Sequence, residues 1–186
     1  MDNTQEILEL KKQIKVLKLR ERYYNLIVQN SMHSIIIIQN QKIIFANKQV
    51  LNVLGYTLKK LRTTSFIDFV HPDDVQKVIL NHKNRLEGKP AEDEYDFRII
   101  NNTNNIVWVR INTMLIPWKG KPAVLIFFKN ITVDKEKEEK NIHTQKLLLE
   151  SEKKYREFVE LFPETIYETD MQGTLTYANK KALELF

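Results

Sequence analysis

The sequence predicts an α+β fold in which a five-stranded antiparallel sheet carries helices on one face and a long helix flanks each end. Five stretches rich in β-branched and aromatic residues, separated by turn residues, have the length and composition of strands. They come as a first pair and a last three, with helical patterns between the two groups. Residues 4–30 and 133–162 contain no Gly or Pro and repeat apolar residues at helical spacing.

The composition is that of a globular chain with room for one domain and part of another. Hydrophobic residues fill 42% of the 186 positions, so a packed core is expected. The chain has no cysteine, which excludes disulfides, thiolate metal sites and cysteine nucleophiles. Lys and Glu are interspersed along residues 134–140, so we ascribe the net charge of +5 to solvated helices and expect no nucleic-acid surface.

No part of the sequence predicts direct insertion into a membrane. The longest apolar runs, Ile35–Ile38 and Ala123–Phe128, are too short to cross a bilayer. The first residues lack the basic and apolar regions of a signal peptide. We therefore expect a cytoplasmic chain, which leaves open a membrane anchor elsewhere in a longer parent protein.

The first predicted helix carries an apolar stripe. Residues at three- and four-residue spacing, interrupted at Glu21, form one seam: Ile7, Leu10, Ile14, Leu17, Tyr24 and Val28. A lone helix would expose this seam to water, so we expect it to pair with the same helix of a second chain. Packing back on its own domain, especially after Tyr23, is the alternative.

The next segment predicts a hairpin followed by a capped helix. Ser34–Gln39 and Lys42–Ala46 have the composition of strands, and residues 40–41 supply the turn between them. Asn47 is a good N-cap for the helix that follows. Gly55 is placed to end that helix in the left-handed conformation.

Two short helical segments, Leu58–Leu61 and Ser65–Val70, lead to a longer helix. The run His71-Pro72-Asp73-Asp74 predicts its start, because Pro suits the first helical position and carboxylates are favourable at the positive end of the helix dipole. The helix is expected to end near Glu87. Its predicted inner side consists of Val75, Val78, Ile79, His82 and Leu86.

The last group of strands is predicted over Glu92–Ile100, Ile106–Ile116 and Ala123–Ile131. The first two alternate between apolar and polar residues, as expected for strands with one buried face. The third is almost entirely apolar, which predicts a central strand. Residues 101–105 and 117–121 are the predicted turns.

The arrangement of helix, hairpin and capped helix occurs twice. Phe45-Ala46-Asn47-Lys48 is echoed by Tyr177-Ala178-Asn179-Lys180, and Tyr155 follows Tyr23 by the same 132 positions that separate the two Asn residues. The copies therefore align without a gap, which predicts tandem domains joined by helices. We expect the second copy to be incomplete. Residues 163–186 are predicted to be poorly ordered or to pair with another chain, because a lone hairpin and helix bury little apolar surface.

Five motifs in order resemble a PAS domain of the sensory-box type, found in bacterial and archaeal signalling proteins. They are Phe45-Ala46-Asn47-Lys48, Leu54-Gly55-Tyr56, His71-Pro72-Asp73-Asp74, the strands Tyr95-Asp96-Phe97-Arg98 and Ile106-Val107-Trp108-Val109, and Asn130-Ile131-Thr132. The family's closing motif is Asp-Ile-Thr, where this chain has Asn130. The resemblance implies an N-terminal helix over residues 1–21, a PAS domain over 22–133, a linker helix over 134–153 and the first part of a second PAS domain over 154–186.

The resemblance also implies a sensory and dimerisation module. A conformational change is expected to pass through Asn130, Ile131 and Thr132 into the next helix, toward an output domain of the parent chain, as in a histidine kinase of a two-component phosphorelay. The flanking helices would form a homodimer. Input to a diguanylate cyclase or a transcription regulator is the alternative. No catalytic residue is predicted, since the chain has no glycine-rich nucleotide loop and His143 lacks the sequence that follows a phosphoacceptor histidine.

In PAS domains a ligand lies between the sheet and the long helix. The candidate pocket residues here are Phe66, Phe97, Val109, Val124, Ile126 and Phe128. The bulk of Ile126 favours a filled core with no cofactor, while haem, flavin or a small apolar metabolite are alternatives. His82 lies on the helix that carries the haem ligand in some relatives and is the haem candidate. No metal site is expected, because the four histidines are not paired at helical spacing.

Overall fold

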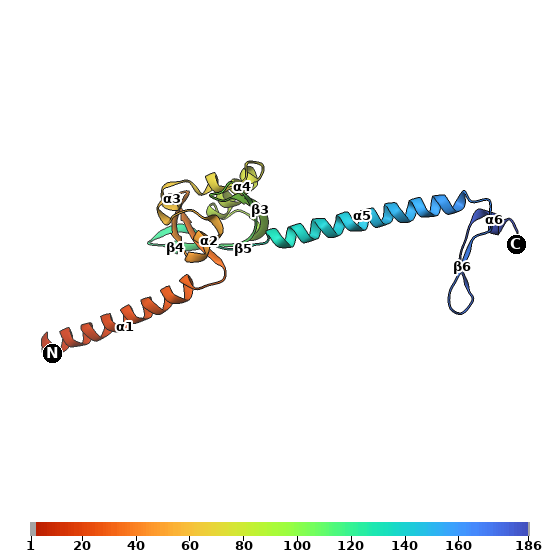
Figure 1. Ribbon diagram of the computed structural model, residues 1–186. Coiled ribbons are helices and arrows are strands. Elements are labelled where there is room, and N and C mark those ends of the chain that lie inside the picture. Colours follow the sequence, from red (N-terminus) through yellow and green to blue (C-terminus); the bar gives the residue numbers. More distant parts are fainter. Residues whose placement is uncertain (1–2, 186) are drawn as a thin grey trace. The chain divides into compact units, whose positions relative to one another are not determined.

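The computed structural model describes residues 3–185, which divide into two compact units between Val133 and Asp134. The first unit contains a long helix, α1 (Asn3–Gln29), and a domain of strands and shorter helices (Figure 1). The second contains most of helix α5 (Thr132–Glu160) and a small hairpin. No helix within residues 3–185 combines the length and the apolar character that a bilayer span needs.

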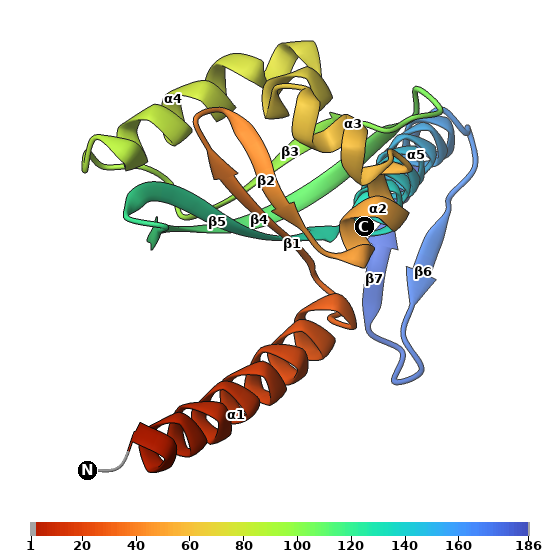
Figure 2. The ribbon, with the colours of Figure 1, turned by 90° about the vertical axis from the view of Figure 1, so that its left-hand side faces the viewer.

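The first unit is built on one antiparallel sheet of five strands. In chain order these are β1 (Ser34–Gln39), β2 (Lys42–Ala46), β3 (Glu94–Ile100), β4 (Ile106–Trp118) and β5 (Lys121–Asn130). Their order in space is β2-β1-β5-β4-β3, so the apolar strand β5 is central, as its composition predicts. Figure 2 shows helices α3 and α4 together on one side of this sheet. The predicted α+β fold with a five-stranded antiparallel sheet is confirmed.

The helices of the domain lie where the sequence predicts them, although the second is two residues longer than predicted and a 3₁₀ turn precedes the longest. They are α2 (Lys48–Leu54), α3 (Leu58–Thr63), the 3₁₀ turns Phe66–Phe69 and Pro72–Asp74, and α4 (Val75–Leu86). The Asn47 side chain accepts a hydrogen bond from the Val50 amide and caps α2. Gly55, with φ of 71°, ends the same helix, and the Thr57 hydroxyl caps α3.

The hairpin between β4 and β5 is longer than predicted, and its turn is shorter. Pro117 pairs with Pro122 and Trp118 with Lys121, so the strands continue through the predicted turn. Only residues 119–120 remain for the connection, with φ of 50° and 74°. Two residues with positive φ form the tight turn whose twist matches the flanking strands, which allows the ladder to run to its end.

The inner side of α4 differs from the prediction. Val78 is buried, but Ile79 and Leu86 are 45% and 40% exposed. Asn81 and Arg85 are buried instead, because they form hydrogen bonds to the segment before β3. Val75 and His82 are half-buried, as predicted. The buried face is therefore only displaced toward Asn81 and Arg85, since polar side chains with partners occupy inward positions.

The core lies between the inner face of the sheet and the short helices. Ile38, Val50, Leu61, Val109 and Val124 are at most 1% exposed. Alternate residues of β3 and β4 enter this core, as predicted from their alternation. All members of the cluster of buried hydrophobic residues lie between Ile36 and Phe128, so the domain has its own core.

Helix α1 exposes most of its apolar seam. Ile14 is 50% and Leu17 is 54% exposed. Only its last turns contact the domain, where Tyr24 and Val28 line a groove with Phe45 and other residues of the outer face of the sheet. The end of the helix thus packs on its own domain, as the alternative predicts. The remainder presents an apolar stripe to solvent within the described residues, and its pairing with a second chain stays a prediction.

The second unit repeats the start of the first. Strands β6 (Tyr167–Thr169) and β7 (Leu175–Ala178) form a hairpin that leads into α6 (Lys180–Leu183), which Asn179 caps. The prediction of a gapless repeat is wrong. By their contacts, Val159 corresponds to Val28, 131 positions earlier, whereas Asn179 corresponds to Asn47, 132 positions earlier.

The extra residue lies in the turn of the second hairpin. Residues 170–174 connect its last strand pair, whereas four residues, 39–42, connect the corresponding pair of the first hairpin. Both hairpins have an irregularity at the same place, between Ile37 and Ile38 and between Glu168 and Thr169. Insertions in an exposed turn change little else, so the pattern on either side of the turn is retained. Disorder or pairing of residues 163–186 stays a prediction.

Candidate ligand cavity and signal junction

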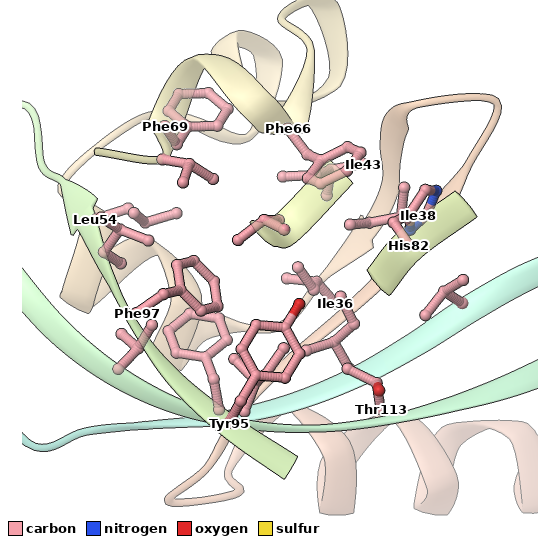
Figure 3. A pocket seen from close by; sticks show the side chains of 18 of the residues that line it. Ile36, Ile38, Ile43, Leu54, Phe66, Phe69, His82, Tyr95, Phe97 and Thr113 are labelled. Carbon is pink, nitrogen blue, oxygen red and sulfur yellow. The ribbon is translucent and has the colours of Figure 1, made fainter. Parts of the chain in front are cut away.

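All six predicted pocket residues line one cavity. The cavity lies between the inner face of the sheet and the segment from α2 to α4, and has a volume of about 60 Å³. Phe97, Val109 and Val124 line it from three different strands, and Phe66 lines it from a 3₁₀ turn. Figure 3 shows Phe97 and Phe66 on opposite sides of the space. Such a volume admits a molecule of a few atoms, whereas sites for larger ligands typically measure about 300–1,000 Å³. That a ligand binds here stays a prediction.

The polar groups of the cavity come from four residues, Tyr95, Thr113, His82 and Arg85. Sequence reasoning selected His82, as the haem candidate, but not the other three. Tyr95 is 7% exposed, and its hydroxyl points away from the sheet into the space between the lining side chains (Figure 3). Burial raises its pKa to about 12, so the hydroxyl is neutral at physiological pH. Within residues 3–185 this hydroxyl has no hydrogen-bond partner.

His82 lies at the rim of the cavity, where its ring packs against Phe66 with 4.8 Å between ring centres. Burial lowers its pKa, and the nearby positive charge of Arg85 lowers it further. The imidazole is therefore neutral above its ordinary pKa of 6.5 and for some distance below it. His82 thus packs as a neutral, half-buried ring against Phe66.

Arg85 is buried because the loop before β3 surrounds it. Its guanidinium donates to the Glu92 carbonyl oxygen and to the Asp93 carboxylate, the latter at 2.9 Å. Thr113 donates its hydroxyl to the Asp93 carbonyl oxygen at 3.2 Å. These contacts hold a charged and a polar side chain at one end of an otherwise apolar cavity, and they compensate the removal of Arg85 from water.

Asp73 and Asp74 bind one arginine. The Asp74 carboxylate accepts hydrogen bonds from the Arg98 backbone amide, from Nε and from Nη2, at 2.8 to 2.9 Å. Asp73 accepts a further bond from Nη2 at 3.1 Å. The hydrogen bonds from Arg98 hold the pKa of Asp74 below its usual value of 3.8. The dipole argument from the sequence thus missed the partner of these carboxylates, which lies 24 positions after Asp74 and 25 after Asp73.

The predicted relay residues form the junction between β5 and α5. The Asn130 side-chain oxygen accepts a hydrogen bond from the Thr132 amide at 2.9 Å, and so caps the helix. Ile131 is 5% exposed and donates its amide to the Trp108 carbonyl oxygen. The Trp108 amide donates to the Thr132 hydroxyl at 3.0 Å. Asn130 thus makes the hydrogen bond without the charge that Asp has in the family's motif.

The junction is connected to the start of α4. The Arg98 guanidinium, which binds Asp74, lies 5.5 Å from the centre of the Trp108 ring. Trp108 in turn bonds through its backbone to Ile131 and Thr132. Consecutive contacts therefore link α4, β3, β4 and the first turn of α5. Among residues 3–185 no group of three His, Asp or Glu side chains is placed to hold a metal ion.

Family models match both units. A PAS fold model matches residues 43–128, and a PAS domain model matches residues 153–186. Together the two matches span more than half of the chain. The resemblance inferred from the motifs is therefore confirmed.

Known proteins with related sequence or structure include a kinase and proteins with PAS or sensory box domains. Sporulation kinase A of Bacillus subtilis (strain 168) is 27% identical over 131 residues, which cover 70% of this chain and 22% of that protein. The PAS domain of an HTR-like protein from Haloarcula marismortui has a TM-score of 0.54 at 16% identity, over 65% of this chain and 99% of the other. A domain of a sensory box sensor histidine kinase/response regulator from Geobacter sulfurreducens has a TM-score of 0.51 at 14% identity, over 61% and 96%.

The family models and the ordered sequence motifs agree on the same family. The chain spans about a fifth of the length of its curated relative, and the solved structures share the fold at low identity. The chain belongs to the PAS family and is a PAS sensory module, with a PAS domain over residues 43–128 and a second PAS match over residues 153–186.

Proposed function

We propose that this chain is the input module of a histidine kinase and passes a conformational change into α5. The observation that carries the proposal is the set of contacts from Asp74 through Arg98 and Trp108 to Thr132. A change on the side of α4 and the cavity alters the position of β3, and the last member of the set is the first turn of the outgoing helix. The mechanism is a shift between two populated arrangements of the junction.

The experiment removes one hydrogen bond from this set. Thr132→Val keeps the shape of the side chain but deletes the bond to the Trp108 amide. We expect the signal dependence of the parent protein's kinase activity to fall, because only the bond from the Ile131 amide to the Trp108 carbonyl oxygen then joins this part of β4 to the start of α5. Thr144→Val is the matched control, since the Thr144 hydroxyl bonds only to the Lys140 carbonyl oxygen within α5. Equal activity of both variants and the parent, with and without signal, would contradict the proposal.

Helix phase tests the same relay independently. Inserting one residue after Glu139 rotates the rest of α5 by about 100°, whereas inserting seven restores its face. We expect the first insertion to change the output and the second to retain it. A diguanylate cyclase or a transcription regulator is the alternative output, and the sequence of the parent protein after residue 186 distinguishes the three.

The proposal includes a homodimer through the flanking helices. The exposed apolar seam of α1 supports it, because water contact over several turns is unfavourable for Ile and Leu side chains. No cofactor is proposed. A cavity of about 60 Å³ does not fit haem or flavin without displacement of core side chains. In this conformation there is therefore no room for a haem beside His82.

A second candidate function is the detection of a small uncharged molecule. The Tyr95 hydroxyl, which forms no hydrogen bond within residues 3–185, favours it, because it faces the cavity and gains a hydrogen bond from a ligand there. We expect small alcohols or ketones to shift the NMR signals of residues that line the cavity, and Tyr95→Phe to weaken these shifts at least threefold. The variant should unfold at an unchanged or higher urea concentration, since no protein hydrogen bond is lost. Equal shifts in both proteins would contradict this candidate.

A further inference from the structure

Asn47 is completely buried and uses all of its hydrogen-bonding capacity. Its Oδ1 accepts from the Ile35 amide at 3.0 Å and from the Val50 amide at 3.3 Å. Its Nδ2 donates to the Val28 carbonyl oxygen at 3.0 Å and to the His33 carbonyl oxygen at 2.9 Å. One side chain therefore contacts the end of α1, the connection after it, strand β1 and helix α2.

The second unit builds the same arrangement around Asn179, which is also completely buried. Its Oδ1 accepts from the Ile166 and Ala182 amides, each at 3.0 Å. Its Nδ2 donates to the carbonyl oxygens of Val159 at 3.3 Å and Glu164 at 2.9 Å. Two segments of different sequence thus give an Asn the same four hydrogen bonds. They do so although the second hairpin has one more residue in its turn.

A second contact accompanies the Asn in each unit. The side chain of Gln29, the last residue of α1, accepts a hydrogen bond from the Lys48 amide at 3.0 Å. Glu160, the last residue of α5, accepts one from the Lys180 amide at 2.7 Å. These contacts join the end of each long helix to the first turn of the short helix that follows the hairpin.

We propose that Asn47 and Asn179 are the joints that fix each long helix to the domain that follows it. The two halves of the carboxamide have different tasks. The oxygen bonds to an amide of the first strand and to an amide of the short helix. Its bond to the helix is that of an ordinary N-cap. The nitrogen holds carbonyl oxygens at and after the end of the long helix, groups that have no partner within that helix.

The consequence is that a rotation or shift at the end of a long helix reaches β1 and α2, or their counterparts in the second unit, without passing through the cavity. Asn47 and Asn179 are positioning residues in this scheme. The inference concerns entry of motion into a domain, whereas the proposed relay through Asn130–Thr132 concerns its exit. Either proposal, the joint or the relay, can be contradicted without affecting the other.

Asn47→Asp separates the two halves of the joint. Asp retains the acceptor oxygen and is itself a good N-cap, but it has no N–H to donate and places negative charge against two carbonyl oxygens. In the complete 186-residue chain at pH 7, we expect amide hydrogen exchange in the last turn of α1, residues 26–29, to become at least tenfold faster. Exchange of the β5 amides should stay within threefold of the original chain, because the sheet keeps its bonds.

Asn52→Asp is the matched control. It introduces the same change on the same helix α2, where the exposed Asn52 side chain bonds only to Gln49. Its exchange pattern should equal that of the original chain. Unchanged exchange at residues 26–29 in Asn47→Asp would overturn the joint.

If the β5 amides of Asn47→Asp also exchange rapidly, that variant has failed to fold. Asn179→Asp then provides the test. We then expect faster exchange confined to residues 157–160, at the end of α5. Unchanged exchange there would overturn the proposal. Measurement needs only the chain itself, so a failure of the joint is distinguishable from a failure of the proposed relay, which is read from kinase output.

Discussion

At the scale of single residues, the ion pair of Asp74 and Arg98 joins the start of α4 to β3. The two side chains are 18% and 24% exposed, so water screens their charges only in part. Three hydrogen bonds from Arg98 converge on one carboxylate. Such charge-assisted bonds are about twice as strong as neutral ones, and they fix the distance between α4 and β3.

Replacement of Asp74 should therefore destabilise the domain. We expect Asp74→Asn to lower the free energy of unfolding by about 1–2 kcal/mol, since the amide accepts fewer bonds and leaves Arg98 without its main counter-charge. Urea unfolding at pH 7 measures this difference. Asp68→Asn is the control, because Asp68 is exposed in the same region.

The effect has a defined pH dependence. The pKa of Asp74 is lowered in the folded state, so its stabilising contribution is complete above its usual value of 3.8 and is lost as the pH falls through the folded pKa. The difference between the original chain and Asp74→Asn should be constant from pH 7 to about 5 and should shrink below about 3.8. A difference that stays constant into that acidic range would contradict this account.

Residue-level prediction from the sequence succeeded for one class of side chain. Alternation along a strand determines which side chains share a face, so Phe97, Val109 and Val124 could be assigned to one pocket. Tyr95 lies two positions before Phe97 on the same face, and this spacing alone could have included it. Arg85 and the Asp74–Arg98 pair could not be found this way, because their partners are distant in sequence and no local pattern encodes them.

At the scale of elements, the caps were predictable because they depend on nearby residues. Asn47, Thr57 and Gly55 act within three or four positions of the helix ends that they stabilise. The orientation of α4 was not predictable, since it depends on hydrogen bonds from Asn81 and Arg85 to another segment. Apolar periodicity is reliable only where the inward positions are apolar.

The two glycines at helix ends differ in their surroundings, which allows a matched test. Gly55 and Gly88 have φ of 71° and 69°. A Cβ at Gly55 would overlap the Asn102 carboxamide, whereas a Cβ at Gly88 meets nothing within 4 Å. We expect Gly88→Ala to lower the free energy of unfolding by about 1 kcal/mol through backbone strain. Gly55→Ala should lower it by about 1–3 kcal/mol more, because Asn102 must move.

Urea unfolding of both variants checks this order. The Asn102 amide also donates to the Leu54 carbonyl oxygen, so displacement of Asn102 disturbs the end of α2. Equal losses in the two variants would show that the Asn102 side chain rotates away freely. The double variant with Asn102→Ala should restore most of the additional loss.

At the scale of the whole molecule, the exposed seam of α1 sets the assembly state that we propose. Ile14→Glu places a charge in the middle of the seam and should raise the dissociation constant of the dimer at least tenfold, because burial of the carboxylate is unfavourable. Gln13→Glu is the control with the same added charge at a neighbouring exposed position. Sedimentation equilibrium of the original chain and both variants measures the effect. A monomeric original chain at high concentration would contradict the dimer.

The division into two units was predictable in outline from the repeated motif Ala-Asn-Lys, but not in register. Matching Tyr23 to Tyr155 suggested a constant offset, whereas contacts of the two Asn residues show that the offset changes in the hairpin turn. A sequence repeat shows which residue types recur. The hydrogen bonds of the two Asn side chains show which positions of the two units are equivalent.

The equivalence of the two Asn environments has a consequence for how such chains can be built. A long helix and the hairpin after it meet through backbone carbonyl oxygens, at Val28 and His33 or at Val159 and Glu164, and backbone groups are the same in every sequence. The boundary therefore makes few demands on side-chain identity. Exchange of everything after residue 158 for the residues that follow 27 would join compatible surfaces. We therefore expect these two boundaries to be the positions at which sensory modules are exchanged with the least change to their neighbours.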